Sequence, residues 1–264
     1  MKAFDSSPSV FEGNLLLKAL DARDRSLLSR ALEPCEVARG DVLFQAGEDV
    51  SHVTFPMNRT IVTLLVPLHD GRTVETATVG REGAIGGVVS QGYLPAFSQA
   101  VVQVEGTVLR IEAERLQQAK RSSHAIRDLF VRYSDCLLSQ LLQSVACNAV
   151  HSLEQRTLRW LLTLQDRLGT PDLPVTHEVL AEMLGVKRPY LTEVLGRMQR
   201  DGLIRIGRGQ LGLVDRAKAE RASCECHANV RRHFGEVLGA VYGKGGKIVA
   251  VDAGPAVEKL EAGE

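Results

Sequence analysis

The chain has 264 residues, of which 24% are charged and 44% hydrophobic, and its 32 Lys and Arg residues balance its 32 Asp and Glu residues. At about 100–200 residues per domain, this length predicts two domains rather than one. The balanced charge excludes a histone-like polycation but permits a local basic patch. No apolar run approaches the roughly 18 residues that a membrane-spanning helix requires.

The N-terminal residues 1–13 contain acidic side chains and lack the apolar segment of a secretory signal. We therefore expect a cytoplasmic protein with no membrane contact. Its five cysteines are odd in number and scattered, which argues against a disulfide framework.

Short strand-like segments dominate residues 34–112. Turn signals such as Asp70-Gly71 separate runs that are rich in β-branched residues. An Asp-Gly pair between two alternating runs predicts a hairpin, and short strands at regular spacing predict an antiparallel sandwich or barrel. The runs are 42–44, 53–55, 61–66, 74–79, 100–104 and 108–111.

An uninterrupted helical pattern follows from Ile126 to Val150, with apolar residues every three to four positions. Such a helix would extend about 37 Å at 1.5 Å per residue. The period favours a coiled-coil dimer, although a long core helix packed on its own sheet fits the same pattern. The side chains expected at the dimer interface are Phe130, Tyr133, Leu137, Leu141 and Val145.

Residues 151–218 have the pattern of a winged helix-turn-helix. A first amphipathic helix is predicted over Leu153–Leu168, and a second begins after Thr176, a suitable N-cap. Gly185 supplies the turn, because glycine tolerates the left-handed conformation of a sharp helix exit. A third helix is predicted from about Arg188.

The third helix is predicted to have two faces. Leu191, Val194, Leu195 and Met198 form the buried one, and the outward one is polar and basic, as in a helix that enters the major groove. The hairpin-like segment Leu203–Val214 would form a wing against the DNA backbone. The expected DNA contacts are Thr176, His177, Lys187, Arg188, Pro189, Tyr190, Thr192, Glu193, Arg197, Arg205 and Arg208.

Positive charge is concentrated in the same segment. Residues 187–218 hold eight basic and three acidic side chains, a net charge of +5, whereas residues 135–186 have a net charge of −3. A basic face confined to one module is expected of a nucleic-acid-binding protein. An ordinary helical hairpin with a solvated charged face is the alternative.

The chain resembles the Crp/Fnr superfamily of bacterial transcription regulators. The resemblance covers about Leu15 to Asp215 and rests on Arg39–Glu48, Asp70–Arg72 and Val175–Leu195. It implies an α+β fold. The expected parts are a cyclic-nucleotide-binding-like antiparallel β-roll (14–125), a dimerisation helix (126–150), a winged helix-turn-helix (151–218) and a helical extension whose tail is loose after Tyr242 (219–264).

The resemblance also implies a homodimer that binds an inverted-repeat operator on double-stranded DNA and contacts RNA polymerase. By position, base contacts fall on Arg188, Pro189 and Glu193. Arg188 would read guanine and Glu193 would accept from cytosine, while Lys187 and Arg197 would hold phosphates. Many family members have a glutamate where this chain has Pro189, so the operator sequence is expected to differ.

The predicted effector pocket departs from the family pattern. Members that bind cyclic AMP use Gly-Glu and then Arg-Ser or Arg-Thr, and the matching positions here are Gly86-Gly87 and Ser98-Gln99. Without the arginine, a buried phosphate loses its bidentate partner, so we expect no tight cyclic-AMP binding. Arg81 and Glu82 would supply charge to a repurposed pocket for an unidentified small molecule, or would lie on an exposed turn.

The cysteines do not form a recognisable cofactor motif. Cys35 stands alone near the N-terminus, which argues against an iron–sulfur cluster. Cys136 and Cys147 would share one helix face, either opposite their mates in a dimer or as small buried residues. Cys224-Glu225-Cys226-His227 resembles a metal-ligand fragment, but only His233 lies near it in sequence, so we expect no metal.

These patterns predict a sequence-specific DNA-binding regulator and no enzyme, since the chain lacks the common nucleophile, metalloprotease, P-loop and dinucleotide motifs. Two alternatives stay open. One is a constitutive DNA-binding protein whose β-roll serves only as a dimer scaffold. The other is a small-molecule or redox sensor that acts through protein contacts.

Overall fold

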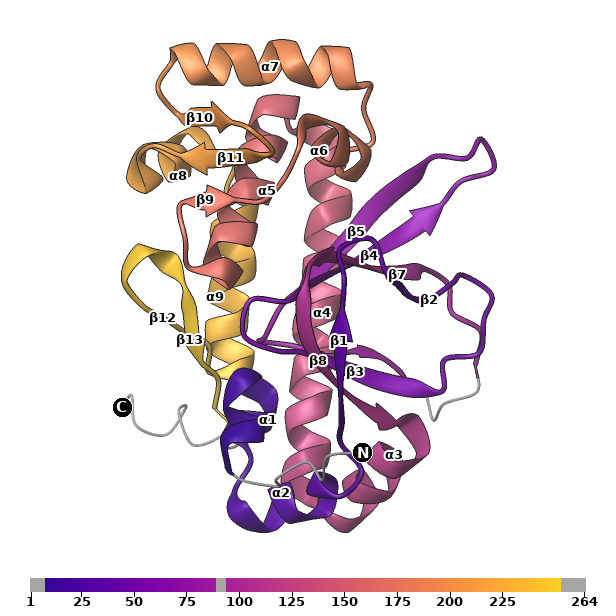
Figure 1. Cartoon of the computed structure of the whole chain (residues 1–264). Coiled ribbons are helices and arrows are strands. Elements are labelled where there is room, and N and C mark those ends of the chain that lie inside the picture. Colours follow the sequence, from indigo (N-terminus) through magenta and orange to yellow (C-terminus); the bar gives the residue numbers. More distant parts are fainter. Residues whose placement is uncertain (1–7, 89–93, 253–264) are drawn as a thin grey trace.

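The computed structural model describes residues 8–88 and 94–252. A long helix, α4 (His124–Val150), runs through the middle of the molecule, with a β-roll on one side and further helices on the other (Figure 1). None of the helices in these two ranges is long and apolar enough to cross a membrane.

Within the described residues, the β-roll consists of two four-stranded antiparallel sheets, in the orders β1-β8-β3-β6 and β2-β7-β4-β5. Apolar residues from both sheets, such as Val62, Val102 and Val108, pack together between them. The strands are β1 (Glu33–Val37), β2 (Val42–Phe44), β3 (His52–Pro56), β4 (Ile61–Pro67), β5 (Thr73–Val79), β6 (Ile85–Gly86), β7 (Gln99–Val104) and β8 (Gly106–Glu112).

The predicted hairpin at Asp70-Gly71 is confirmed. Strands β4 and β5 pair antiparallel up to Pro67 and Thr73, and Gly71 has a φ of +82° in the loop between them. All six predicted runs lie in strands. The sequence did not predict β1, because its segment Glu33-Pro34-Cys35-Glu36-Val37 lacks apolar alternation.

Short helices close the end of the roll nearest to the start of α4 (Figure 1). The buried side chain of Asn14 caps the helix that begins at Leu15: it accepts from the backbone of Leu16 and Leu17 and donates to the carbonyl oxygens of Pro56 and Gly83. These elements are the 3-10 helix η1 (Pro8–Gly13) and the α-helices α1 (Leu15–Ala19), α2 (Ala22–Ser29) and α3 (Ala113–Ser122).

Helix α4 begins at the cap of Ser123, whose hydroxyl accepts from the backbone of Ile126 at 3.1 Å. Its first half is buried against the roll, where the Tyr133 hydroxyl donates to the Ala84 carbonyl oxygen at 2.7 Å. Phe130 and Tyr133 are each 1% exposed, so their predicted place at a dimer interface is wrong. Leu137 and Leu141 are half-buried.

A second apolar stripe of α4 faces outward instead. It consists of Val131, Leu138, Leu142 and Val145, of which only Val145 was predicted for the interface. Cys136 and Cys147 are fully buried within their own subunit, which excludes the idea that they face their mates across a dimer.

The C-terminal part starts with α5 (Leu153–Leu168), whose bounds are those predicted. Ser152 and Gln155 form a capping box at its start, and Gly169 ends it with a φ of +68°. The buried Trp160 belongs to the core that α5 forms with the next elements. Those elements are β9 (Asp172–Leu173), α6 (His177–Met183), α7 (Arg188–Arg200), β10 (Ile204–Gly207) and β11 (Gln210–Leu213).

Residues 216–252 fold back along α4 (Figure 1). Helix α8 (Arg216–Ala222) is followed by α9 (Cys226–Leu238), which packs beside α4. The expectation of a loose tail after Tyr242 is wrong up to residue 252: β12 (Val241–Tyr242) pairs with β13 (Ile248–Ala250) around the turn η2 (Lys244–Gly246), and Ile248 is buried. The remainder of that segment lies outside the described residues.

Candidate nucleic-acid interface

Helices α6 and α7 form the predicted helix-turn-helix. The Thr176 hydroxyl accepts from the backbone of Val179 at 3.3 Å, which confirms Thr176 as the N-cap of α6. Gly185 has a φ of +66° in the turn, a conformation that glycine adopts without steric cost. Pro189 is the second residue of α7, where its missing N–H leaves no hydrogen bond unmade.

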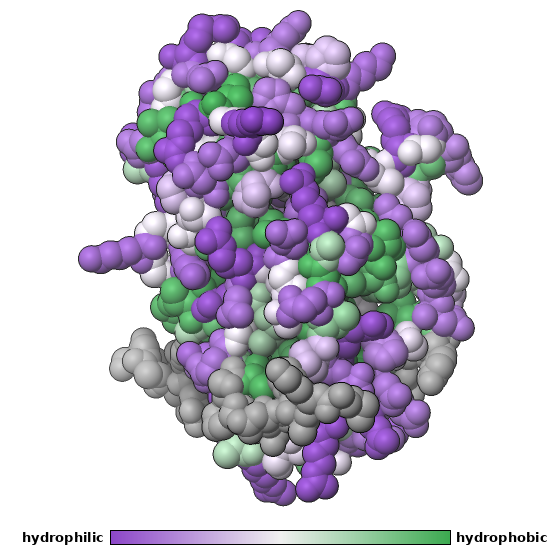
Figure 2. Space-filling view, viewed as in Figure 1, coloured by the Kyte–Doolittle hydropathy of each residue, from purple (hydrophilic) through white to green (hydrophobic). Residues whose placement is uncertain are grey.

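The two faces of α7 are as predicted. Leu191, Val194, Leu195 and Met198 are at most 1% exposed and pack against α5 and α6. The opposite face is open to solvent at the end of the molecule, where hydrophilic residues predominate (Figure 2). The exposed side chains are Lys187, Arg188, Pro189, Tyr190, Thr192, Glu193 and Arg197.

His177 lies behind this face rather than on it. Its Nδ1 is 3.3 Å from the Thr192 hydroxyl, so the start of α6 is tied to the middle of α7. Burial lowers the pKa of His177, and the charge of Arg188 lowers it further. Both effects favour the neutral form of the imidazole.

Strands β10 and β11 form the predicted wing, with Gly209 at a φ of +71° in its turn. Arg208 is exposed beside that turn. Arg205 pairs with Asp172 of β9, although its side chain remains 51% exposed. The wing therefore presents one arginine at its tip and a second that is already engaged by a carboxylate.

Comparisons with known proteins agree with this geometry. A family model described as a Crp-like helix-turn-helix domain matches residues 155–221. A structure described as a Crp/Fnr-family transcriptional regulator from Eubacterium rectale is 18% identical, with 83% of this chain and 98% of that chain covered and a TM-score of 0.60. No curated protein matches the sequence.

FixK2 from Bradyrhizobium japonicum has a TM-score of 0.63 at 14% identity, over 73% of this chain and 98% of its own. CLP from Xanthomonas campestris, described as a global regulator that responds to c-di-GMP, has a TM-score of 0.61 at 20% identity, over 74% of this chain and 100% of its own. Residues 155–221 thus match a Crp-like helix-turn-helix domain, and the chain as a whole has the fold of Crp/Fnr-type regulators. The resemblance to the superfamily and the α+β fold class that the sequence indicated are confirmed.

The effector residues predicted from the sequence lie on several elements of the roll. Gly86 lies in β6 and Gln99 begins β7, in different sheets, with Ser98 just before it. Their neighbours Ile85 and Ala100 are buried in the apolar interior of the roll. Glu82 is 3% exposed, so the exposed-turn interpretation of this residue is wrong.

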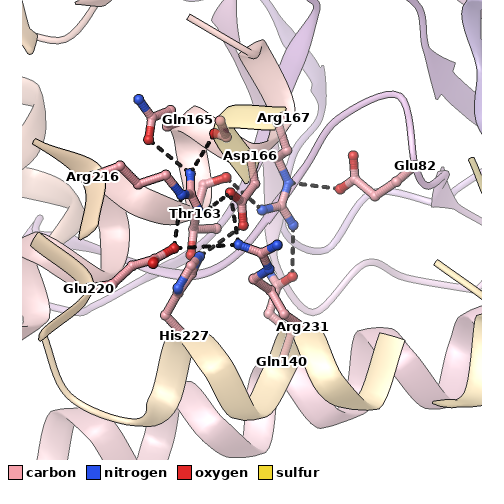
Figure 3. A network of polar contacts seen from close by, with 11 residues as sticks. Glu82, Gln140, Thr163, Gln165, Asp166, Arg167, Arg216, Glu220, His227 and Arg231 are labelled. Atoms are coloured by element: carbon pink, nitrogen blue, oxygen red, sulfur yellow. Dashed lines mark hydrogen bonds and ion pairs between the residues drawn. The ribbon is translucent and has the colours of Figure 1, made fainter. Parts of the chain in front are cut away.

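Glu82 belongs to a junction between the roll and the helix-turn-helix domain (Figure 3). One of its carboxylate oxygens lies 2.7 Å from Nε of Arg167 on α5. Arg167 also donates to the Gln140 side chain on α4 at 2.9 Å, and Gln140 donates to the Thr78 carbonyl oxygen at 3.1 Å. Buried polar groups thus connect α5, α4 and the roll.

Asp166 of α5 is the second centre of this junction (Figure 3). It lies 2.8 Å from Nε2 of His227 and 2.6 Å from Arg216, and Arg231 is 3.6 Å away. Its side chain is 6% exposed. Sequence reasoning missed this network, because each member has the spacing of an ordinary polar residue on an amphipathic helix.

The β4–β5 hairpin also contacts the DNA-binding part directly. The Thr73 hydroxyl donates to Glu182 of α6 at 2.6 Å, and Trp160 of α5 donates its indole N–H to Glu75. Burial raises the pKa of Glu75, while hydrogen bonds from Thr78 and Trp160 oppose that rise. The helix-turn-helix is therefore seated on the roll through specific polar contacts.

Proposed function

We propose that this protein is a transcription regulator that binds an inverted-repeat operator as a homodimer, with α7 in the major groove. The observation that carries the proposal is the division of α7 into a buried apolar face and an exposed basic one within the segment of highest positive charge. A regulator of this kind acts in the cytoplasm, where the DNA and RNA polymerase are.

The groups on α7 suit different parts of DNA. Arg188, in the first turn, carries the planar guanidinium that pairs with O6 and N7 of guanine. Glu193 is a potential acceptor for the amino group of cytosine. Lys187 and Arg197, with Arg208 on the wing, suit phosphates, which fix the position of the protein without reading sequence.

A homodimer would form through the outward stripe of α4. Val131, Leu138 and Val145 are seven residues apart, and with Leu142 they are between 51% and 71% exposed. An exposed apolar stripe with a heptad spacing favours pairing with an identical helix. Two α7 helices held in this way would reach half-sites about 34 Å apart.

Operator binding is proposed to need no cyclic AMP. The matching positions hold Gly87 in place of the acid and Ser98 in place of the arginine that contact the nucleotide in the family, and the interior beside them is apolar. A constitutive regulator is favoured by this packing over one that waits for a phosphate-bearing effector.

Selection of bound sequences from a random DNA pool tests the function, with purified ligand-free protein at fixed salt. Enrichment of an inverted repeat by the wild type, and its loss in Arg188→Ala, is the expected result. Enrichment that is identical for both proteins would remove Arg188 from base recognition. Binding without any selection would contradict the proposed constitutive regulator.

A further inference from the structure

Three cysteines and one histidine meet where α4 ends and α9 begins. Cys147 lies in the last turn of α4, and His151 is the residue that ends this helix. Cys224 follows α8, and Cys226 is the first residue of α9. The four donor atoms, three Sγ and one imidazole nitrogen, all lie within 4.8 Å of one another.

Their separations fit a tetrahedron around a single ion. The Sγ atoms of Cys147 and Cys224 are 3.7 Å apart, and Sγ of Cys226 is 3.4 Å from Nδ1 of His151. Tetrahedral zinc, with Zn–S near 2.3 Å and Zn–N near 2.0–2.1 Å, places two sulfurs about 3.8 Å apart and a sulfur and a nitrogen about 3.6 Å apart.

The three thiols are enclosed, yet they do not pack as ordinary core residues. Cys147, Cys224 and Cys226 are at most 5% exposed, and together they make up a separate buried cluster. Apolar packing alone does not account for three thiols in contact, because hydrocarbon side chains would fill the same space. A closed set of four soft and borderline donors is the arrangement of a structural zinc site.

Groups around the cluster have the roles of outer partners. Nε2 of His151, the ring nitrogen that faces away from the sulfurs, is 3.4 Å from the Glu225 carboxylate. A carboxylate in this position fixes the imidazole tautomer and raises its basicity as a ligand. The Gln143 side-chain amide donates to Sγ of Cys226 at 3.1 Å, as in hydrogen bonds that stabilise a thiolate.

We propose that Cys147, His151, Cys224 and Cys226 bind one Zn²⁺ ion per subunit. The ligand pattern is Cys-x3-His from the end of α4 and Cys-x-Cys from the start of α9. All three thiols would bind as thiolates, so metal binding releases their protons to solvent. The ion would join two segments that are more than seventy residues apart in sequence.

The two histidines that follow the Cys-x-Cys pair in sequence are engaged elsewhere. His227 points to Asp166, and His233 lies 2.7 Å from Asp135. Inspection of the sequence around the pair found only His233, because the second half of the ligand set comes from a distant helix. His151 lies between α4 and α5, so the ion would hold this turn against the start of α9.

Metal analysis of the purified full chain, kept reduced, tests the proposal. We expect one equivalent of zinc per subunit. After the metal is removed by a chelator, added Co²⁺ should give the visible absorption of a tetrahedral thiolate site, and Zn²⁺ should displace it. Cys147→Ser, His151→Gln and Cys224→Ser should each lose this spectrum, while Glu225→Gln should weaken zinc affinity by about tenfold.

Cys35→Ser and His227→Gln are the matched controls, since each removes a potential ligand outside the cluster, and both should retain the metal. The wild-type cobalt titration needs no variant and so stands even where a substitution prevents folding. Folded, reduced wild-type protein without zinc and without a cobalt spectrum would overturn the proposal.

Discussion

Arginines serve two different purposes at the two ends of the helix-turn-helix domain. On α7, Arg188 and Arg197 point into solvent. At the junction with the roll, Arg167 and Arg216 are enclosed and paired with Glu82 and Asp166. The exposed arginines remain available to a polyanion, whereas the buried ones already form ion pairs within the fold. Substitution of the exposed set should therefore change DNA affinity, and substitution of the buried set should change stability.

The largest effect is expected at the junction. Arg167→Ala leaves Glu82 buried without its partner and should lower the free energy of unfolding by about 3–5 kcal/mol. Urea unfolding followed by circular dichroism measures this loss. The double variant Arg167→Met with Glu82→Leu is the control, because removal of both charges should restore much of the stability. A loss below 1 kcal/mol for Arg167→Ala would mean that water reaches this pair.

The second-largest effect is expected from charged substitutions in the exposed apolar stripe of α4. The double variant Leu138→Glu with Leu142→Glu should convert the proposed dimer to a monomer, because each copy would bring like charges to the same seam. Light scattering coupled to size-exclusion chromatography reads the mass. Leu94→Glu, at another exposed leucine, is the control and should stay dimeric. A dimer that survives the double variant would place the interface elsewhere.

On the recognition face, Arg188→Ala should leave the melting temperature unchanged and cost about 1–3 kcal/mol of specific DNA binding. Fluorescence anisotropy with the selected operator and with an unrelated duplex measures both affinities. An equal loss on both duplexes would assign Arg188 to a phosphate instead of a base.

Lys187→Ala should have a smaller effect, spread evenly over all DNA sequences. Loss of one phosphate contact should reduce the slope of log affinity against log salt by about 1. Titrations at several salt concentrations measure this slope, with Lys18→Ala, on the distant helix α1, as the control that leaves it unchanged. A slope unaltered in Lys187→Ala would exclude a phosphate contact.

The smallest stability change is expected for the exposed pair of Arg205 and Asp172. Asp172→Ala should change the free energy of unfolding by less than about 1 kcal/mol, since solvent screens the pair. The same urea titration measures this change. Asp172→Ala should also free Arg205 and strengthen non-specific DNA binding. A stability loss as large as that of Arg167→Ala would erase the distinction between the two kinds of arginine.

Local signals account for what the sequence predicted. Helix α5 and the two faces of α7 follow from caps, a turn glycine and short-range periodicity, and all of these are visible within about twenty residues. In α4, two apolar stripes share one helix, and periodicity does not say which of them meets the roll. The stripe with the larger side chains, Phe130 and Tyr133, packs into the core of its own subunit.

Long-range contacts account for what the sequence missed. The Asp166 network and the cysteine cluster assemble from elements that are 61 and 77 residues apart along the chain. The sequence pattern of a single segment does not predict contacts with a segment so far along the chain. The hairpin of β12 and β13 was missed for a related reason: its glycines indicated a loose tail, whereas Ile248 finds its apolar partners in the first domain.

Phe234, Leu238 and Ile248 complete the core that begins with Phe11 and Leu15. The helix-turn-helix domain is thus an insertion within the roll domain, attached to it at both ends. During synthesis, the whole helix-turn-helix domain would leave the ribosome before the residues that complete the core of the roll domain. The mature domain is held in the same way, because it is joined to the roll domain at both ends and through the buried contact of Arg167 with Glu82.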